Sequence, residues 1–362
     1  MIDRAAEKTE LIDCVRTGQP VMVYAPRRYG KTSLARVVAK EAANVWEIPS
    51  VYVDFWGAAS ITDMMNVLGR SYARVSNVFR VRRFLADLLG SMGFRVNLRG
   101  GFSVSYEGRG TGEEERAALR SLLEVPERLA LRASGNRVLL ILDEFGEILN
   151  VPGEPDALMR NAFQNSPHVS YLFMGSKRSL MDGLFSDRKR PFYNFGRRME
   201  LGRLPHELLG EFVEERFEAA DRRITEGAVD VLLDQVHGHP HRAQQLASHT
   251  FRLAGSGGVA DEETVLAARE EALKEAEPEF RAILDEMSAP RRAVLVAFCR
   301  EPTDQPYSRE YMQRHGIKGP GALTSALDAL IASGHLERTP KGQPVPTDPL
   351  FAFWIRERTN NP

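Results

Sequence analysis

The stretch APRRYGKTS, residues 25–33, has the residue types of a phosphate-binding loop. Gly30, Lys31 and Thr32 fit the pattern G-x-x-x-x-G-K-[ST], and Ala25 stands where the pattern has its first glycine. Such a loop directs successive backbone N–H groups and a helix N-terminus at phosphate oxygens. In that arrangement the Lys31 ammonium would reach the β- and γ-phosphates, and the Thr32 hydroxyl would hold Mg²⁺.

The alanine at position 25 is compatible with a working loop. Gly30 is the residue whose missing Cβ lets the backbone approach the phosphates. Pro26 restricts the residue before it to extended geometry, which suits Ala25. We therefore expect a cofactor-binding segment made of Pro26, Arg27, Arg28, Tyr29, Gly30, Lys31, Thr32 and Ser33.

A second group of candidate residues follows the apolar run from Val138 to Leu142. A strand that ends in Asp143 would bring a carboxylate beside the Mg²⁺ site, and Glu144 would polarise the attacking water. Taken alone, these two residues could also be a solvated strand end. Together with the loop, they predict a site for ATP and Mg²⁺ that can hydrolyse ATP, with Lys31 and Glu144 catalytic and Thr32 and Asp143 on the metal.

These motifs need strands that end where the motifs begin. The apolar runs 21–24 and 138–142 each precede a motif, and the second run reads as a strand buried on both faces. Strands that alternate with helical segments predict a doubly wound α/β core with a parallel sheet. The other expected elements are strands in SVYVDFWG, HVSYLFMGS and RRMELGRL, helices near 60–92 and 113–134, and a hairpin around Gly100-Gly101.

The chain changes character after Pro205. Helical patterns fill residues 205–285, with breaks at HGHPHR and GSGGVADEE. Beyond them, the helices PRRAVLVAFCR, SREYMQRH and ALTSALDALIASG precede a strand and a hairpin, HLERTPKGQPVPTDP, which is a winged-helix outline. We expect an ATPase core over residues 1–204, a helical lid over 205–283 and a winged helix-turn-helix domain over 284–362.

The motifs together resemble the bacterial and archaeal AAA+-like P-loop ATPases close to the STAND class. The family's loop has the form G-P-R-R-x-G-K-T-S-L, and this chain has APRRYGKTSL, with a departure only at Ala25. The resemblance extends to DEF, FMGSKRSLMDGLF, RPFY, GHPHRAQQLA and DPLFAFWIR, and so covers essentially the whole chain. It implies that ATP binds between the core and the helical lid and that a winged helix ends the chain.

The resemblance also implies roles for residues outside the two motifs. Ser176 resembles the first sensor, which positions water near the γ-phosphate; its alternative is an ordinary serine at a strand end. Arg242 resembles the second sensor of the lid, which would couple the γ-phosphate to lid closure. In STAND relatives the turn Gly238-His239-Pro240 lies near the adenine and phosphates instead, so Pro240 and Arg242 are both expected at the nucleotide.

Two further groups of residues have open interpretations. In SDRKRPFYNFGRR, Arg188, Arg190 or Arg197 could act as an arginine finger toward a neighbouring subunit of a homo-oligomer, or the run could be a solvated basic loop. The three histidines of HGHPH, residues 237, 239 and 241, could alternatively ligate a metal, but no Asp, Glu or Cys stands near them to complete the site.

The winged helix predicts a partner of one of two kinds. One is duplex DNA, and the other is a separate effector protein, as in a STAND-like signalling switch or effector loader. Residues 285–362 hold ten Lys and Arg against nine Asp and Glu, so the basic footprint of a DNA binder is weak. We favour DNA slightly, with Thr324 and Ser325 at base edges and Lys318, Arg338 and Lys341 at phosphates; further contacts could come from Arg95, Arg99, Arg109 and residues 80–83.

The terminal aromatic residues Phe351, Phe353 and Trp354 are expected to dock the last helix onto the winged helix, with a stacking surface for single strands as the alternative. The net charge of −1 gives no global electrostatic argument for nucleic acid or membrane binding. Cys14 and Cys299 show no metal spacing, and no apolar run reaches the length of a membrane span. We expect a cytoplasmic protein without membrane contact.

Overall fold

The computed structural model describes most of the chain, and the described residues form two units by their contacts. The α/β unit comprises residues 4–25 and 31–201, and the helical unit comprises residues 26–30 and 202–362. Described are residues 4–75, 87–91, 94–97, 103–106, 112–132, 137–339 and 341–360. Gly100-Gly101, Arg99, Arg109 and residues 80–83, which the sequence singled out, lie outside this set.

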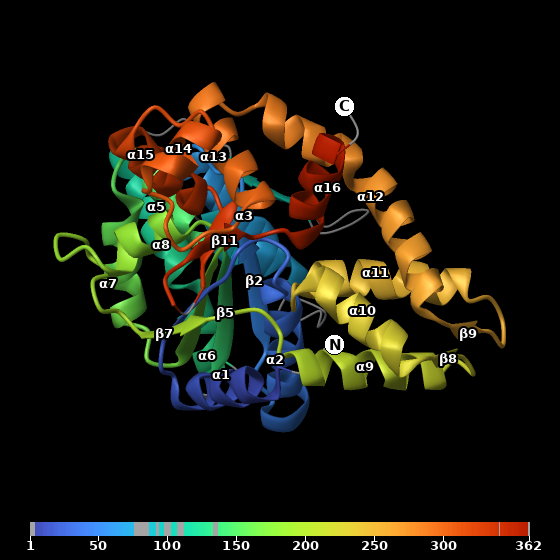
Figure 1. The fold of residues 1–362 in the computed structure, drawn as a ribbon. Helices are drawn as coiled ribbons and strands as arrows, with labels where there is room; N and C mark the ends of the chain where they lie inside the picture. The colour runs from blue at the N-terminus through green and yellow to red at the C-terminus, as the bar shows by residue number, and fades with distance from the viewer. Residues whose placement is uncertain are drawn as a thin grey trace. The chain divides into compact units, whose positions relative to one another are not determined.

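A five-stranded parallel sheet forms the centre of the α/β unit (Figure 1). The strand order is β2-β5-β6-β1-β7, and every neighbouring pair runs parallel. Parallel neighbours require crossover connections, which are helical here, so the predicted doubly wound α/β fold is confirmed. The strands are β1 (Val21–Tyr24), β2 (Ser50–Asp54), β5 (Val138–Asp143), β6 (Val169–Gly175) and β7 (Arg197–Glu200).

Helices cover both faces of this sheet. One face carries α1 and α2, and there Ser170 Oγ donates to the carbonyl of Val15 at 2.6 Å. The other face carries the larger core, in which Val51, Leu140 and Phe173 are buried. Because β5 and β6 are covered on both faces, every residue of each is buried, which explains their continuous apolar runs. The helices of this unit are α1 (Ala5–Thr17), α2 (Lys31–Trp46), α3 (Ile61–Val75), α5 (Gly112–Leu123), α6 (Val125–Arg132), η1 (Phe145–Asn150), α7 (Pro155–Gln164) and α8 (Arg178–Phe185).

Between β2 and β5 the sequence predicts a hairpin and one helix, and the structure confirms the hairpin but not the single helix. The hairpin is confirmed, since β3 (Phe94–Asn97) pairs antiparallel with β4 (Ser103–Tyr106). The single helix expected near 113–134 is instead two helices, α5 and α6, which meet at Glu124. Pro126 lies in the first turn of α6, where its missing N–H costs nothing, and it would interrupt a continuous helix.

Residues 205–285 of the helical unit are mostly helical, as the periodicity predicts, and in the structure they form four helices. They enclose a core that includes Leu209, Leu232 and Leu246. A parallel pair of two-residue strands joins them, β8 (Arg223–Ile224) and β9 (Val259–Ala260), which were not predicted because two residues leave no periodic signal. The helices are α9 (His206–Glu218), α10 (Glu226–Val236), α11 (Pro240–Leu253) and α12 (Glu262–Asp285).

The rest of the helical unit has the predicted winged-helix outline. Three helices precede the antiparallel pair β10 and β11, which form the wing, and a last helix follows. Phe351 and Trp354 are buried against Phe280, so these two rings dock the last helix and offer no stacking surface. The elements are α13 (Ala289–Arg300), α14 (Arg309–Arg314), α15 (Pro320–Ala332), β10 (Leu336–Arg338), β11 (Pro344–Pro346) and α16 (Pro349–Asn360).

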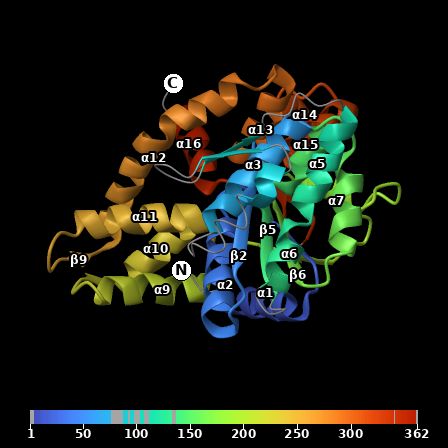
Figure 2. The ribbon, with the colours of Figure 1, turned by 180° about the vertical axis from the view of Figure 1, so that it is seen from behind.

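The long helix α12 belongs to both parts of the helical unit (Figures 1 and 2). Its first half contributes Val265 and Ala268 to the core of the four helices. From Ala272 onward it contributes to the core of the winged helix, with Ala272 and Phe280. The two cores are therefore joined by one continuous helix. None of the described helices is long and apolar enough to cross a membrane.

Truncation of Phe173 should destabilise the α/β unit strongly. Its side chain is fully buried, and its ring contacts those of Phe145, Phe185 and Phe192. We expect Phe173→Ala to lower the free energy of unfolding by about 3–5 kcal/mol, measured by denaturant titration. The exposed Leu131→Ala is the control and should change it by less than about 0.5 kcal/mol; equal effects of the two substitutions would contradict the assigned core.

Candidate nucleotide-binding site

The order of the strands brings three motif segments to one edge of the sheet. The phosphate loop follows β1, Ser176 follows β6, and Asp143 ends β5. Because β6 lies between β1 and β5 and all three are parallel, their carboxyl ends lie side by side. Ligands of open α/β sheets bind at such carboxyl ends. The fold therefore gathers Lys31, Thr32, Asp143, Glu144 and Ser176 within the α/β unit.

The loop has the backbone that its sequence predicts. Ala25 is fully buried and is not among the residues with positive φ, so the methyl group in place of the first glycine is accommodated. Gly30 has φ of 88°, a conformation that favours glycine. Arg28 also has a positive φ, of 70°. The helix α2 begins at Lys31, so its first N–H groups are directed at the loop.

The Lys31 ammonium is held close to the loop backbone. Its side chain is buried, and Nζ donates to the carbonyl of Ala25 at 2.6 Å. A buried ammonium at a helix N-terminus adds its charge to the positive end of the helix dipole. This combination suits phosphate groups, which carry negative charge and accept hydrogen bonds.

Thr32 and Asp143 form the candidate metal site. Thr32 Oγ1 donates to Asp143 Oδ2 at 3.1 Å, and the backbone N–H of Glu144 donates to Asp143 Oδ1 at 2.9 Å. Only 5% of the Asp143 surface is exposed. A hydroxyl and a carboxylate are the hard oxygen ligands that Mg²⁺ takes in proteins, usually together with water and substrate phosphates. The donor set therefore fits the predicted metal.

Tyr52 also belongs to this group, although the sequence did not point to it. Its hydroxyl donates to Asp143 Oδ2, the same oxygen that accepts from Thr32. Burial, assisted by the hydrogen bond to Asp143, raises the pKa of the Tyr52 phenol, so the hydroxyl keeps its proton. The pairing register of β2 with β5 aligns Tyr52 with Ile141 and Asp54 with Asp143, and this register was the missing information.

Glu144 is bound to Ser176 across the end of the sheet. Ser176 donates to Glu144 Oε2 from its hydroxyl at 2.8 Å and from its backbone N–H at 3.2 Å. Glu144 itself has a positive φ of 47° where β5 passes into η1, an uncommon conformation for glutamate. The carboxylate predicted to polarise water and the predicted first-sensor serine are therefore in direct contact.

The middle of the loop, residues 26–30, is grouped by its contacts with the helical unit. Tyr29 is buried, and its hydroxyl donates to Glu337 Oε2 on strand β10 of the wing at 2.7 Å. Its ring packs edge-on against His239, with 5.0 Å between the ring centroids. Arg28 forms an ion pair with Glu279 of α12 at 2.8 Å. Burial raises the pKa of the Tyr29 phenol, so it remains a hydrogen-bond donor.

The turn Gly238-His239-Pro240 begins helix α11. Gly238 has φ of 73°, and a Cβ there would lie 2.4 Å from the carbonyl oxygen of Leu204, so only glycine fits. His239 caps the helix by accepting a hydrogen bond from the backbone N–H of Arg242 at 3.3 Å. Burial lowers the pKa of His239 to about 3, so its ring is neutral and Nδ1 is free to accept.

Arg242 lies in a buried ion pair. Its Nε lies 3.0 and 2.9 Å from the two carboxylate oxygens of Asp348, and Nη1 donates to Gln245 at 2.6 Å. Burial opposes the charge of Asp348, but the hydrogen bonds and charge of Arg242 hold the pKa of Asp348 below its usual range. In this state Arg242 joins α11 to the start of α16. Its role as second sensor, with a contact to the γ-phosphate, stays a prediction.

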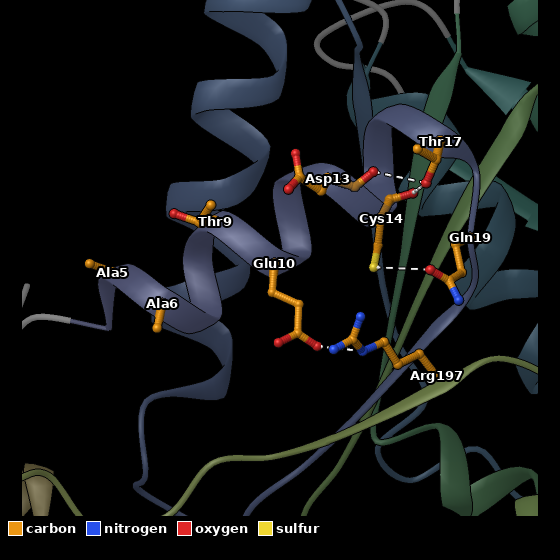
Figure 3. A pocket seen from close by; sticks show the side chains of 9 residues that line it. All are labelled: Ala5, Ala6, Thr9, Glu10, Asp13, Cys14, Thr17, Gln19 and Arg197. Carbon is orange, nitrogen blue, oxygen red and sulfur yellow. Dashed lines mark hydrogen bonds and ion pairs between the residues drawn. The ribbon is translucent and has the colours of Figure 1, made fainter.

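The three arginine-finger candidates have different surroundings. Arg190 forms an ion pair with the buried Asp156 at 3.3 Å. Arg197 pairs with Glu10 at 2.7 Å across a shallow hollow between α1 and β7, which also contains Cys14 (Figure 3). Arg188 is exposed, and among the described residues no ion pair engages it. Of the three, Arg188 is the one whose guanidinium has no carboxylate partner within the described chain.

The metal alternative for the three histidines of this turn has no support in the described part of the chain. There, no group of three or more His, Cys, Asp and Glu side chains could hold a metal ion. Burial lowers the pKa of His237, His239 and His241 alike. His239 instead caps α11 and contacts Tyr29.

Comparisons with known proteins agree with this fold. A family model described as a probable winged helix domain matches residues 278–357. The Walker-type ATPase of Pyrococcus abyssi is similar over 98% of this chain and 96% of its own, with 17% identity and a TM-score of 0.67. The chain has the fold of an AAA+-like P-loop ATPase with a C-terminal winged helix. The ORC2 protein of Aeropyrum pernix, solved in ADPNP-ADP complexes, is similar over 100% of this chain and 94% of its own, with 16% identity and a TM-score of 0.61. No curated protein matches the sequence.

Substitutions at the two ends of the loop should differ in their effect on nucleotide affinity. Ala25→Gly removes a methyl group from a position whose φ is not positive, so we expect the nucleotide Kd to change by less than about threefold, which is under 1 kcal/mol. Gly30→Ala would force a Cβ into the left-handed region at a cost of about 1–2 kcal/mol, which weakens binding roughly tenfold. Calorimetric titration with ATP measures both. A loss above tenfold for Ala25→Gly would show that the loop geometry is wrong.

Proposed function

We propose that this protein binds and hydrolyses ATP with Mg²⁺ at the loop of residues 26–33, and that its nucleotide state regulates a winged helix that binds duplex DNA. The proposal divides the chain into an ATPase core (1–204), a helical lid (205–283) and a winged helix-turn-helix domain (284–362). The AAA+-like fold supports it, as does the gathering of the predicted catalytic residues at one sheet edge. We expect slow turnover that a partner stimulates.

The roles of the residues follow from their chemistry. Lys31 and the N–H groups of the loop would bind phosphate oxygens, and Thr32 and Asp143 would hold Mg²⁺, which neutralises phosphate charge when bound. Glu144 would accept the proton of the attacking water. Ser176, which donates two hydrogen bonds to Glu144, would orient that carboxylate. Pro240 and Arg242 are proposed to lie near the nucleotide, and Arg188 is proposed as a finger toward a neighbouring copy of the chain.

The hydrogen bond from Tyr29 to Glu337 is the observation that carries the regulatory part of the proposal. Tyr29 precedes Gly30, whose backbone must approach the phosphates, while Glu337 lies on the wing beside the exposed Arg338. Arg203 also binds Glu337 and donates to the wing carbonyl of Pro346 at 2.9 Å. A change in the loop on nucleotide binding could therefore act on the wing through the buried Tyr29.

On the surface of the winged helix, the exposed cations support DNA binding, and the exposed face of α15 supports a protein partner. Lys318, Arg338 and Lys341 are exposed around the wing and could meet phosphates. The exposed face of α15, however, carries no cation: its residues are Gly321, Ala322, Thr324, Ser325 and Asp328. This face, whose one charged residue is Asp328, favours the second candidate function, a STAND-like switch or loader in which the winged helix binds a separate effector protein.

ATP turnover with and without duplex DNA separates these two functions. We expect DNA to raise the turnover rate and added salt to reduce that stimulation, because phosphate contacts release counterions. Lys31→Ala is the blank, and Glu144→Gln should lower turnover at least about a hundredfold, as expected for loss of a general base. Turnover that ignores DNA at every salt concentration would favour the protein partner. Wild-type turnover in Glu144→Gln would remove that carboxylate from the mechanism.

Removal of the Tyr29 hydroxyl should change nucleotide affinity. If the bond to Glu337 holds the loop in its nucleotide-free arrangement, Tyr29→Phe should lower the ATP Kd about fivefold, near 1 kcal/mol. Glu337→Gln keeps an acceptor for the tyrosine but removes the charge that strengthens the bond and pairs with Arg203, so it should act in the same direction. The double variant should gain less than the sum of the two single variants, because both weaken the same bond.

The exposed Tyr307 of the same winged helix supplies the matched control. Tyr307→Phe should leave the ATP Kd unchanged. Fully additive effects of Tyr29→Phe and Glu337→Gln, or no effect of either, would contradict the proposed coupling.

A further inference from the structure

A positioning residue can be identified beside the candidate metal site. We propose that Tyr52 positions Asp143 for Mg²⁺, so that Mg²⁺-dependent nucleotide binding depends on the Tyr52 hydroxyl although this hydroxyl is not itself a ligand. The inference rests on the proposed ATP site and adds a residue to it that neither the loop motif nor the DEF motif contains.

Asp143 accepts hydrogen bonds from three different elements. The N–H of Glu144 fixes Oδ1, the Thr32 hydroxyl of α2 donates to Oδ2, and the Tyr52 hydroxyl of β2 donates to the same Oδ2. Asp143 is buried, with 5% of its surface exposed, so its carboxylate depends mainly on protein donors rather than on water. Tyr52 is thus one of two side chains that determine which way Oδ2 points.

The placement of Tyr52 follows from the sheet. Val51 and Val53 face the buried core, so Tyr52 and Asp54 face the opposite side of β2. Asp54 is in register with Asp143, which places Tyr52 diagonally across from the carboxylate on the same face of the sheet. Both strands are part of the rigid sheet, and β5 is buried throughout. The tyrosine can therefore hold the carboxylate in one orientation without moving itself.

Thr32 and Tyr52 differ in what else they can do. The Thr32 oxygen can ligate a cation through its lone pairs while it still donates its hydrogen to Asp143. Tyr52 donates to Asp143 from the neighbouring strand β2, and its hydroxyl also interacts with the Thr32 side chain, so it contacts both residues of the candidate metal site. Partners of this kind, which orient metal ligands, typically contribute 10- to 100-fold in metal affinity.

The test measures how much Mg²⁺ tightens nucleotide binding. Calorimetric titration with ADPNP, in MgCl₂ and in EDTA, gives two Kd values. The Kd in EDTA divided by the Kd in MgCl₂ is the Mg²⁺ gain. We expect Tyr52→Phe to reduce this ratio about tenfold while the Kd in EDTA stays within about twofold of wild type. The control is Tyr193→Phe, which removes the hydroxyl of a partly exposed tyrosine in the same unit and should leave both Kd values unchanged.

A second variant separates positioning from a general effect on folding. In Asp143→Asn the carboxylate is already lost, so adding Tyr52→Phe should reduce the Mg²⁺ gain no further. A further reduction in that background, or an unchanged Mg²⁺ gain in Tyr52→Phe alone, would overturn the role of Tyr52. Equal weakening in EDTA and MgCl₂ would also overturn it, since that outcome indicates a structural role. A different result would contradict the proposed ATP site itself: wild-type protein that does not bind ADPNP, or that binds it equally well without Mg²⁺.

Discussion

A partly buried hydrogen bond between the Tyr29 hydroxyl and the Glu337 carboxylate ties the phosphate loop to the wing. The two residues are 308 positions apart in the chain, and the bond lies among other polar contacts of the helical unit. Arg203 shares Glu337, His239 packs on the Tyr29 ring, and Arg28 pairs with α12. Removing one partner from the buried part of this network, the Tyr29 hydroxyl, leaves a polar group less well satisfied, which costs up to about 1–3 kcal/mol. A loop held in this way can respond to phosphates only if the network adjusts.

The other end of the loop is held by different partners. Lys31 donates to Ala25, and Thr32 donates to Asp143, which Tyr52 and the Glu144 backbone hold in turn. These contacts connect the start of α2 to β5 and β2. Within the helical unit, Tyr29 is therefore held by the wing, and within the α/β unit Thr32 is held by Asp143. Gly30 and Lys31, between them, are the residues whose backbone and side chain would meet phosphate. In the proposed function, these contacts are the route by which nucleotide and winged helix would influence each other.

Much of the site could be predicted from the sequence because each motif is short and follows a strand. Lys31, Thr32, Asp143 and Glu144 were identified in this way, and the parallel order of the strands brings them together with Ser176. The doubly wound core and the winged-helix outline were also predicted, because their apolar runs and helical periods are long. The break between α5 and α6 was missed although Pro126 marks it, since helical periodicity continues on both sides.

The contacts that sequence could not supply are those that join distant segments. Tyr52 reaches Asp143 only through the register of β2 with β5. Tyr29 meets Glu337, and Arg242 meets Asp348 over a separation of 106 residues. No local pattern encodes such pairs, because their residue types are common on any surface. The ion pair of Arg242 also shows the limit of a family resemblance. The motif GHPHR predicts that Arg242 lies at the start of α11, but it does not predict that its partner is Asp348 at the start of α16.

Hydrogen exchange of the wing, residues 336–346, with and without a saturating ATP analogue, tests the central claim most directly. The account predicts that nucleotide changes the exchange rate of these amides in the wild-type protein and that Tyr29→Phe abolishes the difference, because the loop then has no hydroxyl with which to hold Glu337. Exchange in the wing that stays the same on nucleotide binding in the wild-type protein, with the loop itself protected, would contradict the account: the loop would then bind nucleotide without any effect on the winged helix.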